Sequence, residues 1–496
     1  MNHSLITTEI LVVLLGLGVL LADLWIKPES RPALGWLAAA ILGCILALSL
    51  GAITSEDGSA YGGMFVLDGL ARYFKGFFLL AGLLVILMTV EFRHRLPVGL
   101  SEFYALTLFA LAGMLFAASA NDFILMFVSL ELITVTFFVL NSFQRSRLAS
   151  LEAGVKYLIL GGVASAFMIF GIALIFGSAN TTNFSLVAAQ QAQLAHNPVF
   201  LTGLMLTLVG LGFKIAAFPF HLWAPDVYQG SPAPATAFLS VGSKAAGFVL
   251  LLRVLFGAVP QITAQWQTLL TVMSAITILY GSLCALPQRN FKRLLGYSSI
   301  ANAGYLLLGV AAENRTGSSA VLYYLGGYFF TVLAIFTVLC SLSTAIDTDE
   351  IHGLNGLGRR SPLLAAALSI GLVSLAGIPP MVGFFGKFQL LAAVLDAARL
   401  APAFYVLLAV AVVGVVLSLY YYFNVIRAMY WGDAPAGVTA IAVNAPAKIA
   451  LLICLSGVLY LGIAPGGLLR LADGAVAGLK FGPANTPKSA AVAVAH

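Results

Sequence analysis

Long apolar segments constrain the fold of this sequence more than any other feature. About fourteen of them are long enough to cross a membrane, at about 20 residues per crossing, and together they cover most of the 496 residues. Only 9% of the residues are charged, whereas a typical soluble domain has about 25%. The segments are apolar on every side, unlike the alternating strands of a β-barrel. The sequence therefore predicts an all-α integral membrane protein.

The predicted spans are residues 5–26, 34–53, 70–90, 101–118, 122–141, 153–176, 200–223, 235–257, 266–286, 294–312, 319–343, 363–395, 402–426 and 446–469. The twelfth has 33 residues, which as one helix would be about 50 Å long against a hydrocarbon core of about 30 Å. Pro379 and Pro380 interrupt it, and Pro219 interrupts the seventh. We predict a broken helix at both places, although a single proline such as Pro219 is also compatible with a plain kink.

The two interrupted spans are five apart, so equivalent helices would run in opposite directions. This spacing predicts two inverted five-helix repeats, spans 4–8 and 9–13, and paired interrupted spans point to a transport site. The predicted units are residues 1–100 (three N-terminal helices), 101–258 (first repeat), 266–428 (second repeat) and 429–496 (a last helix and a flexible tail from about residue 470).

Basic residues predict the orientation, because they are enriched in cytoplasmic loops. They gather in the loops after odd-numbered spans: Lys27, Arg31, Arg93, Arg95, Arg145, Arg147, Arg289, Lys292, Arg293, Arg359, Arg360 and Arg427. Both termini are therefore predicted on the non-cytoplasmic side of a plasma membrane.

Four charged residues fall near the middle of predicted spans: Glu131, Lys214, Lys244 and Lys387. Each costs about 2.5–3.5 kcal/mol when left unpaired in the membrane. One alternative is that they only pair to hold helices together, but three lysines do not balance one glutamate. Burial disfavours the charged form of a lysine, so a buried lysine can release a proton. We predict a proton path through these residues, with Glu131 and Lys214 as a switchable pair.

Weaker candidates surround these four. Polar stripes occur on one helix face at Ser298, Asn302 and Tyr305, and at Tyr324, Tyr328 and Thr331, although such stripes also form simple interhelical hydrogen bonds. Three further proton-path candidates each have an ordinary alternative: Glu152 with Lys156 as a helix ion pair, His221 as a packed and hydrogen-bonded histidine, and Lys292 as a topology marker.

No cofactor site is expected in this chain. The four cysteines are scattered within apolar stretches, without the spacing of a metal or iron–sulfur site, and we expect them to be small core residues. Phosphate-binding and haem-attachment motifs are not found in the sequence either.

Three long motifs carry a resemblance to a known family. They are FKIAAFPFHLWAPDVYQGSP at 213–232, QRNFKRLLGYSSI at 288–300, and LAGIPP at 375–380 followed by GFFGKF at 383–388. Together with the number of spans, they make the whole chain similar to the antiporter-like membrane subunits of respiratory complex I. Lys244 and the SPAPATA run before it narrow the resemblance to one subunit type.

The resemblance implies that the family's four charged positions fall on Glu131, Lys214, Lys244 and Lys387. It implies a proton-translocating subunit of an NADH–quinone oxidoreductase, with no redox centre of its own. FMN, iron–sulfur clusters, NADH and quinone are then expected in sister subunits. The expected partners are other membrane subunits, including neighbouring antiporter-like ones, and the lipid bilayer, with no nucleic acid. Two alternatives stay open: a subunit of a cation/proton antiporter or membrane-bound hydrogenase, and a structural subunit that transports nothing.

Overall fold

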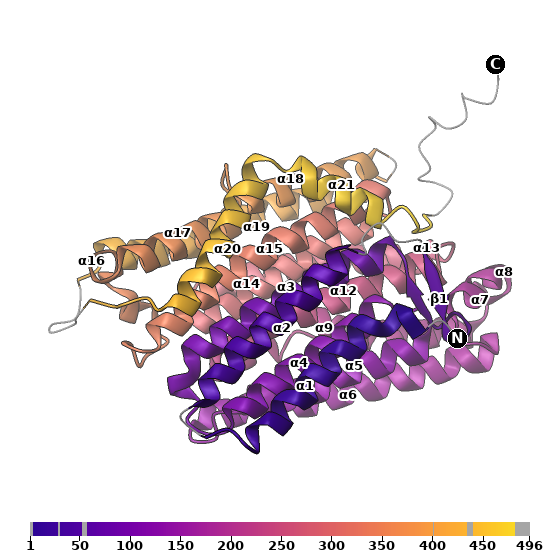
Figure 1. The fold of residues 1–496 in the computed structure, drawn as a ribbon. Coiled ribbons are helices and arrows are strands. Elements are labelled where there is room, and N and C mark those ends of the chain that lie inside the picture. Colours follow the sequence, from indigo (N-terminus) through magenta and orange to yellow (C-terminus); the bar gives the residue numbers. More distant parts are fainter. Residues whose placement is uncertain (1–2, 28–29, 52–56, 400, 434–439, 482–496) are drawn as a thin grey trace.

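The computed structural model describes residues 3–27, 30–51, 57–399, 401–433 and 440–481. Among these residues, 13 helices are long and apolar enough to cross a membrane. They match the predicted spans in order, apart from the twelfth, which is present as two shorter helices. Figure 1 shows the long helices running side by side in one bundle. The predicted all-α integral membrane fold is confirmed.

The first half of the bundle contains α1 (Thr7–Asp23), α2 (Arg31–Gly51), α3 (Gly69–Phe92), α4 (Leu100–Ala118), α5 (Phe123–Asn141), α6 (Leu148–Ala179), α9 (Pro198–Ile215), α10 (Ala224–Gly230), α11 (Ala233–Phe238) and α12 (Lys244–Arg253). The second half contains α13 (Thr263–Ala285), α14 (Phe291–Ala311), α15 (Arg315–Leu342), α16 (Leu357–Arg360), α17 (Pro362–Ala376), α18 (Val382–Ala398), α19 (Ala403–Trp431), α20 (Ala445–Ile463) and α21 (Gly466–Ala475).

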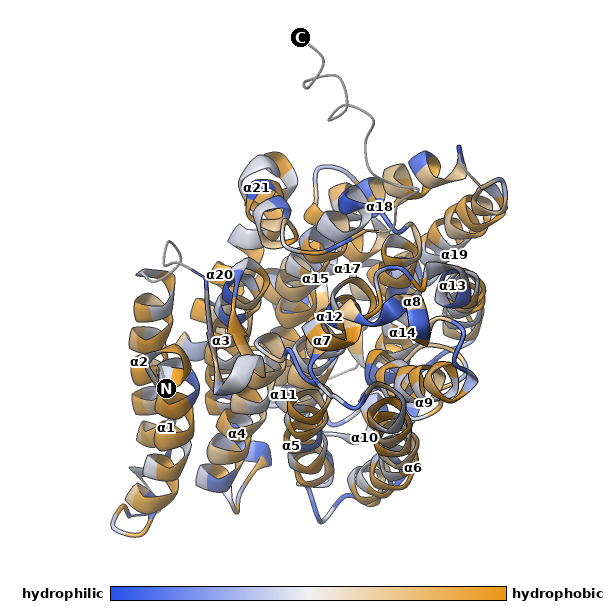
Figure 2. Cartoon of the chain, turned by 90° about the vertical axis from the view of Figure 1, so that its right-hand side faces the viewer, coloured by the Kyte–Doolittle hydropathy of each residue, from blue (hydrophilic) through white to orange (hydrophobic). Residues whose placement is uncertain are grey.

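The core lies along the continuous segment Ala233–Ala258 and along α14 and α15, which are buried almost throughout. By contrast, α6 and α19 expose most of their apolar side chains, as expected for helices that face lipid. In Figure 2 the ribbons of both helices are coloured mostly as hydrophobic residues. Polar side chains on the central helices are therefore shielded from lipid by the helices around them.

Both predicted helix breaks are present. Helix α9 ends at Ile215, earlier than the predicted limit of residue 223, and the next residue, Ala216, is left-handed with φ +58°. Helix α17 ends at Ala376, and the left-handed residue there is Gly377 with φ +84°. Regular helix resumes at Ala224 in α10 and at Val382 in α18. The peptide bonds Phe218–Pro219 and Pro379–Pro380 are cis.

The eighth span contains irregular turns that the sequence analysis did not predict. Residues Leu239–Ser243 and Val254–Ala258 form π-helical turns on either side of α12. Such turns lengthen the hydrogen-bonded ring and occur often at functional sites. The first of them places Lys244 at the start of α12, and so changes the direction in which its side chain leaves the helix.

Three connecting regions are more structured than predicted. The predicted loop 54–69 contains a hairpin of β1 (Gly58–Ala60) and β2 (Phe65–Leu67), and the loop 177–199 contains α7 (Phe184–Ala189) and α8 (Gln191–Leu194). The predicted flexible tail from residue 470 is wrong as far as Ala475, because α21 reaches that residue. Residues 482–496 of that tail, and the end of the second predicted span at 52–53, lie outside the described residues.

A bidentate ion pair joins the end of the eighth span to the start of α3. Arg253 donates to both carboxylate oxygens of Asp68, at 2.8 and 3.0 Å, and its Nε donates to the carbonyl of Ala118. Burial raises the pKa of Asp68, but the Arg253 guanidinium outweighs burial and holds that pKa below its usual value. The pair's contribution to stability is therefore present at neutral pH and is lost as the pH falls through the folded-state pKa.

We expect Asp68→Asn to lower the free energy of unfolding by roughly 2 kcal/mol, because it leaves the buried Arg253 without its counter-charge. The measurement is the thermal unfolding midpoint of the protein purified in mild detergent. Asp57→Asn is the matched control, because Asp57 is 70% exposed in its own arginine pair and its loss should change little. Equal midpoints for Asp68→Asn and the unmodified protein would contradict this role.

Candidate functional site

Three lysines lie buried in the middle of the bundle. The exposed fractions of Lys214, Lys244 and Lys387 are 5%, 2% and 4%. They come from the last turn of α9, the first residue of α12, and α18 just after the second break. Glu131, on α5, is only half-buried. The predicted lysines are thus inside the protein, whereas the glutamate lies closer to the outer face.

Helix geometry makes the end of α9 a suitable place for the Lys214 cation. The last carbonyl groups of a helix lack intrahelical partners and carry partial negative charge. Trp223 donates its indole N–H to one of them, the carbonyl of Phe213, at 3.0 Å. The Lys214 ammonium donates to the Thr134 hydroxyl of α5 at 2.5 Å and approaches the Tyr157 hydroxyl of α6 at 3.5 Å.

Glu131 and Lys214, predicted to be a switchable pair, are not in direct contact in this structure: no ion pair between them occurs among the described residues. The Glu131 carboxylate instead accepts a hydrogen bond from Ser165 of α6. Thr134, which holds Lys214, lies three residues after Glu131 and so nearly on the same side of α5. The two charges therefore share a neighbourhood, with hydroxyl groups as their immediate partners.

Lys214 and Lys244 lie on helices in contact with each other. Helix α9 packs against α12 at Gly247, one turn from Lys244. A Cβ atom at Gly247 would lie only 3.2 Å from the Cβ of Lys214 and 2.7 Å from the side chain of Ile215. The absence of a side chain at this position lets the two lysine-bearing segments approach closely.

Ser299 of α14 is the central polar partner, and the sequence analysis missed it. Lys244 donates to the Ser299 carbonyl at 2.6 Å and also to the Ser299 hydroxyl. The same hydroxyl bonds to Tyr228 of α10 at 2.7 Å and accepts from Tyr328 of α15 at 3.0 Å. One side chain thus joins a lysine of the first half to tyrosines of both halves.

The predicted stripes form a second group of hydrogen bonds nearby, which reaches α19. Asn302 donates to Ser298 at 3.4 Å and accepts from Tyr324 at 2.7 Å. Ser298 in turn bonds to the hydroxyl of Tyr422, at 2.5 Å. These bonds join side chains of the two predicted stripes, whereas the Thr331 hydroxyl bonds to Ser374 of α17.

Lys387 lies beside the second break, with partners of another kind from those of Lys214. Its ammonium donates to the carbonyl of Leu375 at 2.7 Å and approaches that of Ala376 at 3.5 Å, both at the end of α17. It also lies over the ring of Tyr305, 5.0 Å from the centroid. The Tyr305 hydroxyl itself donates to the Ala411 carbonyl, so Tyr305 contributes its ring face rather than its hydroxyl. Freed carbonyl groups therefore hold Lys387 at its break, whereas hydroxyl groups hold Lys214 at the first.

The other candidates lie apart from the buried lysines and their hydrogen-bonded partners. Glu152 and Lys156 form the ion pair expected for a helix, at 2.6 Å, with side chains 56% and 40% exposed. Lys156 also binds Asp226 of α10 at 2.6 Å, and Asp226 is bridged to Arg293 of α14.

His221 is buried between the rings of Phe218 and Tyr280. It is packed, but its ring nitrogens form no hydrogen bond with the described residues, so the hydrogen-bonded alternative is wrong for this structure.

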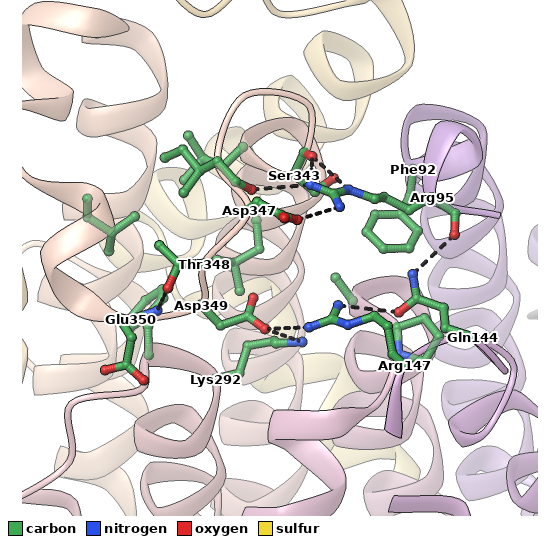
Figure 3. Close-up of a pocket in the computed structure, with 17 residues that line it drawn as sticks. Phe92, Arg95, Gln144, Arg147, Lys292, Ser343, Asp347, Thr348, Asp349 and Glu350 are labelled. Carbon is green, nitrogen blue, oxygen red and sulfur yellow. Dashed lines mark hydrogen bonds and ion pairs between the residues drawn. The ribbon is translucent and has the colours of Figure 1, made fainter. Parts of the chain in front are cut away.

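Lys292 is more than a surface topology marker, since only 3% of it is exposed. It binds Asp349 at 3.0 Å, beside Arg147, which reaches the same carboxylate at 3.5 Å. Figure 3 shows these groups around a small pocket of about 50 Å³, with Arg95 and Asp347 as a second ion pair above them. This loop cluster (Arg95, Arg147, Lys292, Asp347 and Asp349) ties the ends of α3, α14 and α15 together.

Within the part of the chain that the structure describes, no group of three or more His, Cys, Asp or Glu side chains could hold a metal ion. Two of the four cysteines, Cys340 and Cys454, are buried, as predicted for core residues. Cys44 is exposed on α2, so the prediction is wrong for that residue.

The comparisons with known proteins agree with the fold and with the motifs. Residues 120–418 match the family model of the NADH:quinone oxidoreductase/Mrp antiporter membrane subunits. NADH-quinone oxidoreductase subunit N of Moorella thermoacetica is 40% identical over 474 residues, covering 95% of this chain and 98% of that protein. Subunit N of Desulforamulus reducens is 38% identical over 473 residues, with the same two coverages. The chain belongs to the NADH-quinone oxidoreductase subunit N family.

Solved structures give the same relationship. A chain of respiratory complex I from Thermus thermophilus is 32% identical, with a TM-score of 0.79 over 94% of this chain and all of that one. A chain of the Mrp complex from a Dietzia species has a TM-score of 0.81 at 22% identity, covering 97% of this chain and 98% of that one, which shows a shared fold. As a member of the subunit N family, the chain is an antiporter-like, multi-pass membrane subunit.

Proposed function

We propose that this chain moves protons across the membrane as part of an assembled NADH–quinone oxidoreductase. The observation that carries the proposal is the line of buried lysines, Lys214, Lys244 and Lys387, with polar groups around and between them. A buried charge is costly in a membrane protein and marks a functional path more often than a structural one. NADH oxidation and quinone reduction would take place in sister subunits, where FMN and the iron–sulfur clusters would also lie.

The geometry suggests how the chain's own residues would act. Lys214 holds a proton while Thr134 and the end of α9 stabilise its charge, and it gives up that proton more readily when the Glu131 carboxylate is neutralised or moves away. The proton then passes to the Lys244 region, where Ser299, Tyr228 and Tyr328 form a hydrogen-bonded cluster. Hydroxyl groups can both donate and accept, so they suit a relay better than apolar side chains would.

Lys387 would release protons to the opposite side through the second break. The polar network of Ser298, Asn302 and Tyr324 lies on α14 and α15, between the Lys244 cluster and α18. Residues 101–258 and 266–428 would then be the two inverted repeats, each supplying one half of the path. In this arrangement each repeat contributes one broken helix and one lysine beside the break.

The proposal includes an orientation of the bundle in the membrane. The loop cluster lies at the basic end of the bundle, which would face the cytoplasm. The start of α1 and the end of α21 lie toward the other end in Figure 1, which would be the non-cytoplasmic side of a bacterial plasma membrane. Other membrane subunits of the complex, including neighbouring antiporter-like ones, would flank the bundle.

The test is proton uptake into sealed membrane vesicles after NADH is added. We expect Lys244→Met to slow uptake by roughly tenfold or more, and to slow quinone reduction with it if the two are tightly coupled. Lys448→Met is the control, because Lys448 is exposed at the start of α20 and should be neutral. Normal uptake in Lys244→Met, in a complex shown to contain all its subunits, would refute the proposal. Uptake driven by a sodium gradient and not by NADH would favour the antiporter alternative.

A milder change should follow the loss of the Ser299 hydroxyl. Ser299→Ala removes one acceptor of Lys244 and a shared partner of two tyrosines, and we expect proton uptake to fall by roughly three- to tenfold. Ser274→Ala is the matched control, because among the described residues its buried hydroxyl bonds only to the Gly304 carbonyl, between α13 and α14. Equal rates in the two variants would show that the Ser299 hydroxyl is not part of the path.

A further inference from the structure

An apolar cavity opens near the end of the bundle at which α1 begins. It has a volume of about 490 Å³ and lies between α2, α3, α15 and α21. We call it the apolar slot and define it by Leu46, Leu50, Phe77, Leu80, Phe329 and Leu471. Figure 2 looks onto this end of the bundle, with α21 beside α15. The slot is lined by side chains that would bind hydrocarbon.

A polar pocket of about 270 Å³ adjoins the slot and shares Gly69, Arg72, Gly474 and Ala475 with it. Its charged lining consists of Arg72, Arg253, Lys480, Asp57 and Asp68. Arg253 and Asp68 neutralise each other in their bidentate pair. Arg470, which lines the slot, adds another cation at the boundary. The basic groups outnumber the acidic ones, so the combined site favours an anion beside an apolar chain.

The two boundary arginines are available to a ligand. Arg72 pairs with Asp57, but Asp57 is 70% exposed and such a pair is weak, while the Nη1 of Arg72 is buried and donates to none of the described residues. Arg470 is exposed and forms no ion pair within the described part of the chain. Both guanidinium groups can therefore bind phosphate oxygens, which they do with two parallel hydrogen bonds.

The packing leaves this site open. At Gly69 an added Cβ would lie 3.2 Å from the Gly474 carbonyl, so α3 and α21 meet closely there, whereas an added Cβ at Gly474 would meet nothing within 4 Å. The contact at Gly69 closes one wall, and Gly474 leaves free space at the junction of slot and pocket. Helix α21 has the amphipathic character of a helix that lies in the membrane interface, the level at which a lipid headgroup is found.

We propose that this site binds an anionic phospholipid, with an acyl chain in the slot and the headgroup phosphate at Arg72 and Arg470. A bilayer surrounds this end of the bundle and supplies such molecules at high local concentration. The bound lipid would fill the space between α21 and the core helices α3 and α15. The proposal does not depend on the proton path, because none of its residues belongs to that path.

The test places a photoreactive residue in the slot, Leu471→p-benzoylphenylalanine, in the assembled complex. The complex is reconstituted in vesicles with equal amounts of phosphatidylglycerol and phosphatidylcholine, and the lipid attached to this position is identified by mass spectrometry. We expect phosphatidylglycerol to be enriched roughly fivefold or more over its bulk share. Adding Arg72→Gln and Arg470→Gln should return the ratio to that of the bulk, while added inorganic phosphate should leave it unchanged.

A bulk lipid ratio with both arginines present would overturn the proposal, and so would cross-linking to another protein subunit in place of lipid. Displacement of the lipid by inorganic phosphate would show a simple anion site and would also overturn it. Gly474→Trp gives an independent check, because its side chain would fill the junction and should reduce lipid cross-linking at Leu471. Proton uptake, measured in parallel, reports separately on the proposed function.

Discussion

Lys214→Met should reduce NADH-driven proton uptake by roughly tenfold or more, with the complex still assembled. Methionine is unbranched and only one atom shorter than lysine, but it can neither carry a proton nor donate to Thr134. Assembly should survive, because the change removes a buried charge from the end of α9 and adds none. Uptake is measured in sealed vesicles alongside the rate of quinone reduction, and the subunit content is checked on the same sample.

The chain offers a matched control in another buried lysine. Lys75 of α3 is paired with Glu9 of α1 at 2.8 Å, with side chains 3% and 0% exposed. The double variant Glu9→Gln with Lys75→Met removes a balanced buried pair away from the proposed path, so it should leave uptake near normal. A comparable loss of uptake in this control would mean that buried charge matters only for structure, and it would remove the support for Lys214 as a proton carrier.

Lys387→Met should block release of protons at the second break, again with a loss of roughly tenfold or more in uptake. The competing explanation is that Lys387 only satisfies the carbonyl groups at the end of α17. Trp223→Phe separates the two explanations, because Trp223 satisfies the Phe213 carbonyl at the first break without carrying a charge. The Phe213 carbonyl also accepts from the Ala216 N–H at 3.1 Å, so we expect Trp223→Phe to lower stability only modestly and to retain most of the uptake.

The competing explanation would be favoured if Lys387→Met and Trp223→Phe lost uptake to the same extent in fully assembled complexes. The lysine would then act as a helix cap and the path would have to leave the protein elsewhere. Rates are compared per assembled complex, so that a loss of protein is not mistaken for a loss of transport.

The elements that could be predicted from sequence are those with a strong local cause. A lysine within an apolar span stands out by its cost, and Pro379 with Pro380 cannot continue a helix that is already too long to be straight. Both signals act within a few residues, so they identified Lys214, Lys244, Lys387 and the two breaks. The same reasoning placed the polar stripe of Ser298 and Asn302 on one face of a helix.

The partners of these residues could not be predicted, because they depend on how helices are rotated against one another. Ser299 differs from Ser298 by about 100° around α14, and nothing in the sequence indicates which of the two faces Lys244. The π-helical turn before Lys244 also changes the direction of that side chain relative to a regular α-helix. For the same reason the sequence could place Glu131 and Lys214 at a similar depth but could not identify their immediate partners, which are Ser165 and Thr134.

The most direct test of the central claim, that the buried lysines form one path, compares Lys214→Met, Lys387→Met and the double variant in the same vesicles. If the two lysines act in series on one path, replacing both reduces uptake little more than replacing one. The double variant should therefore retain nearly the uptake rate of the slower single variant. Independent contributions would multiply, and two tenfold losses would become roughly a hundredfold loss. A multiplied loss, or normal uptake in either single variant, would contradict a single path through the two breaks.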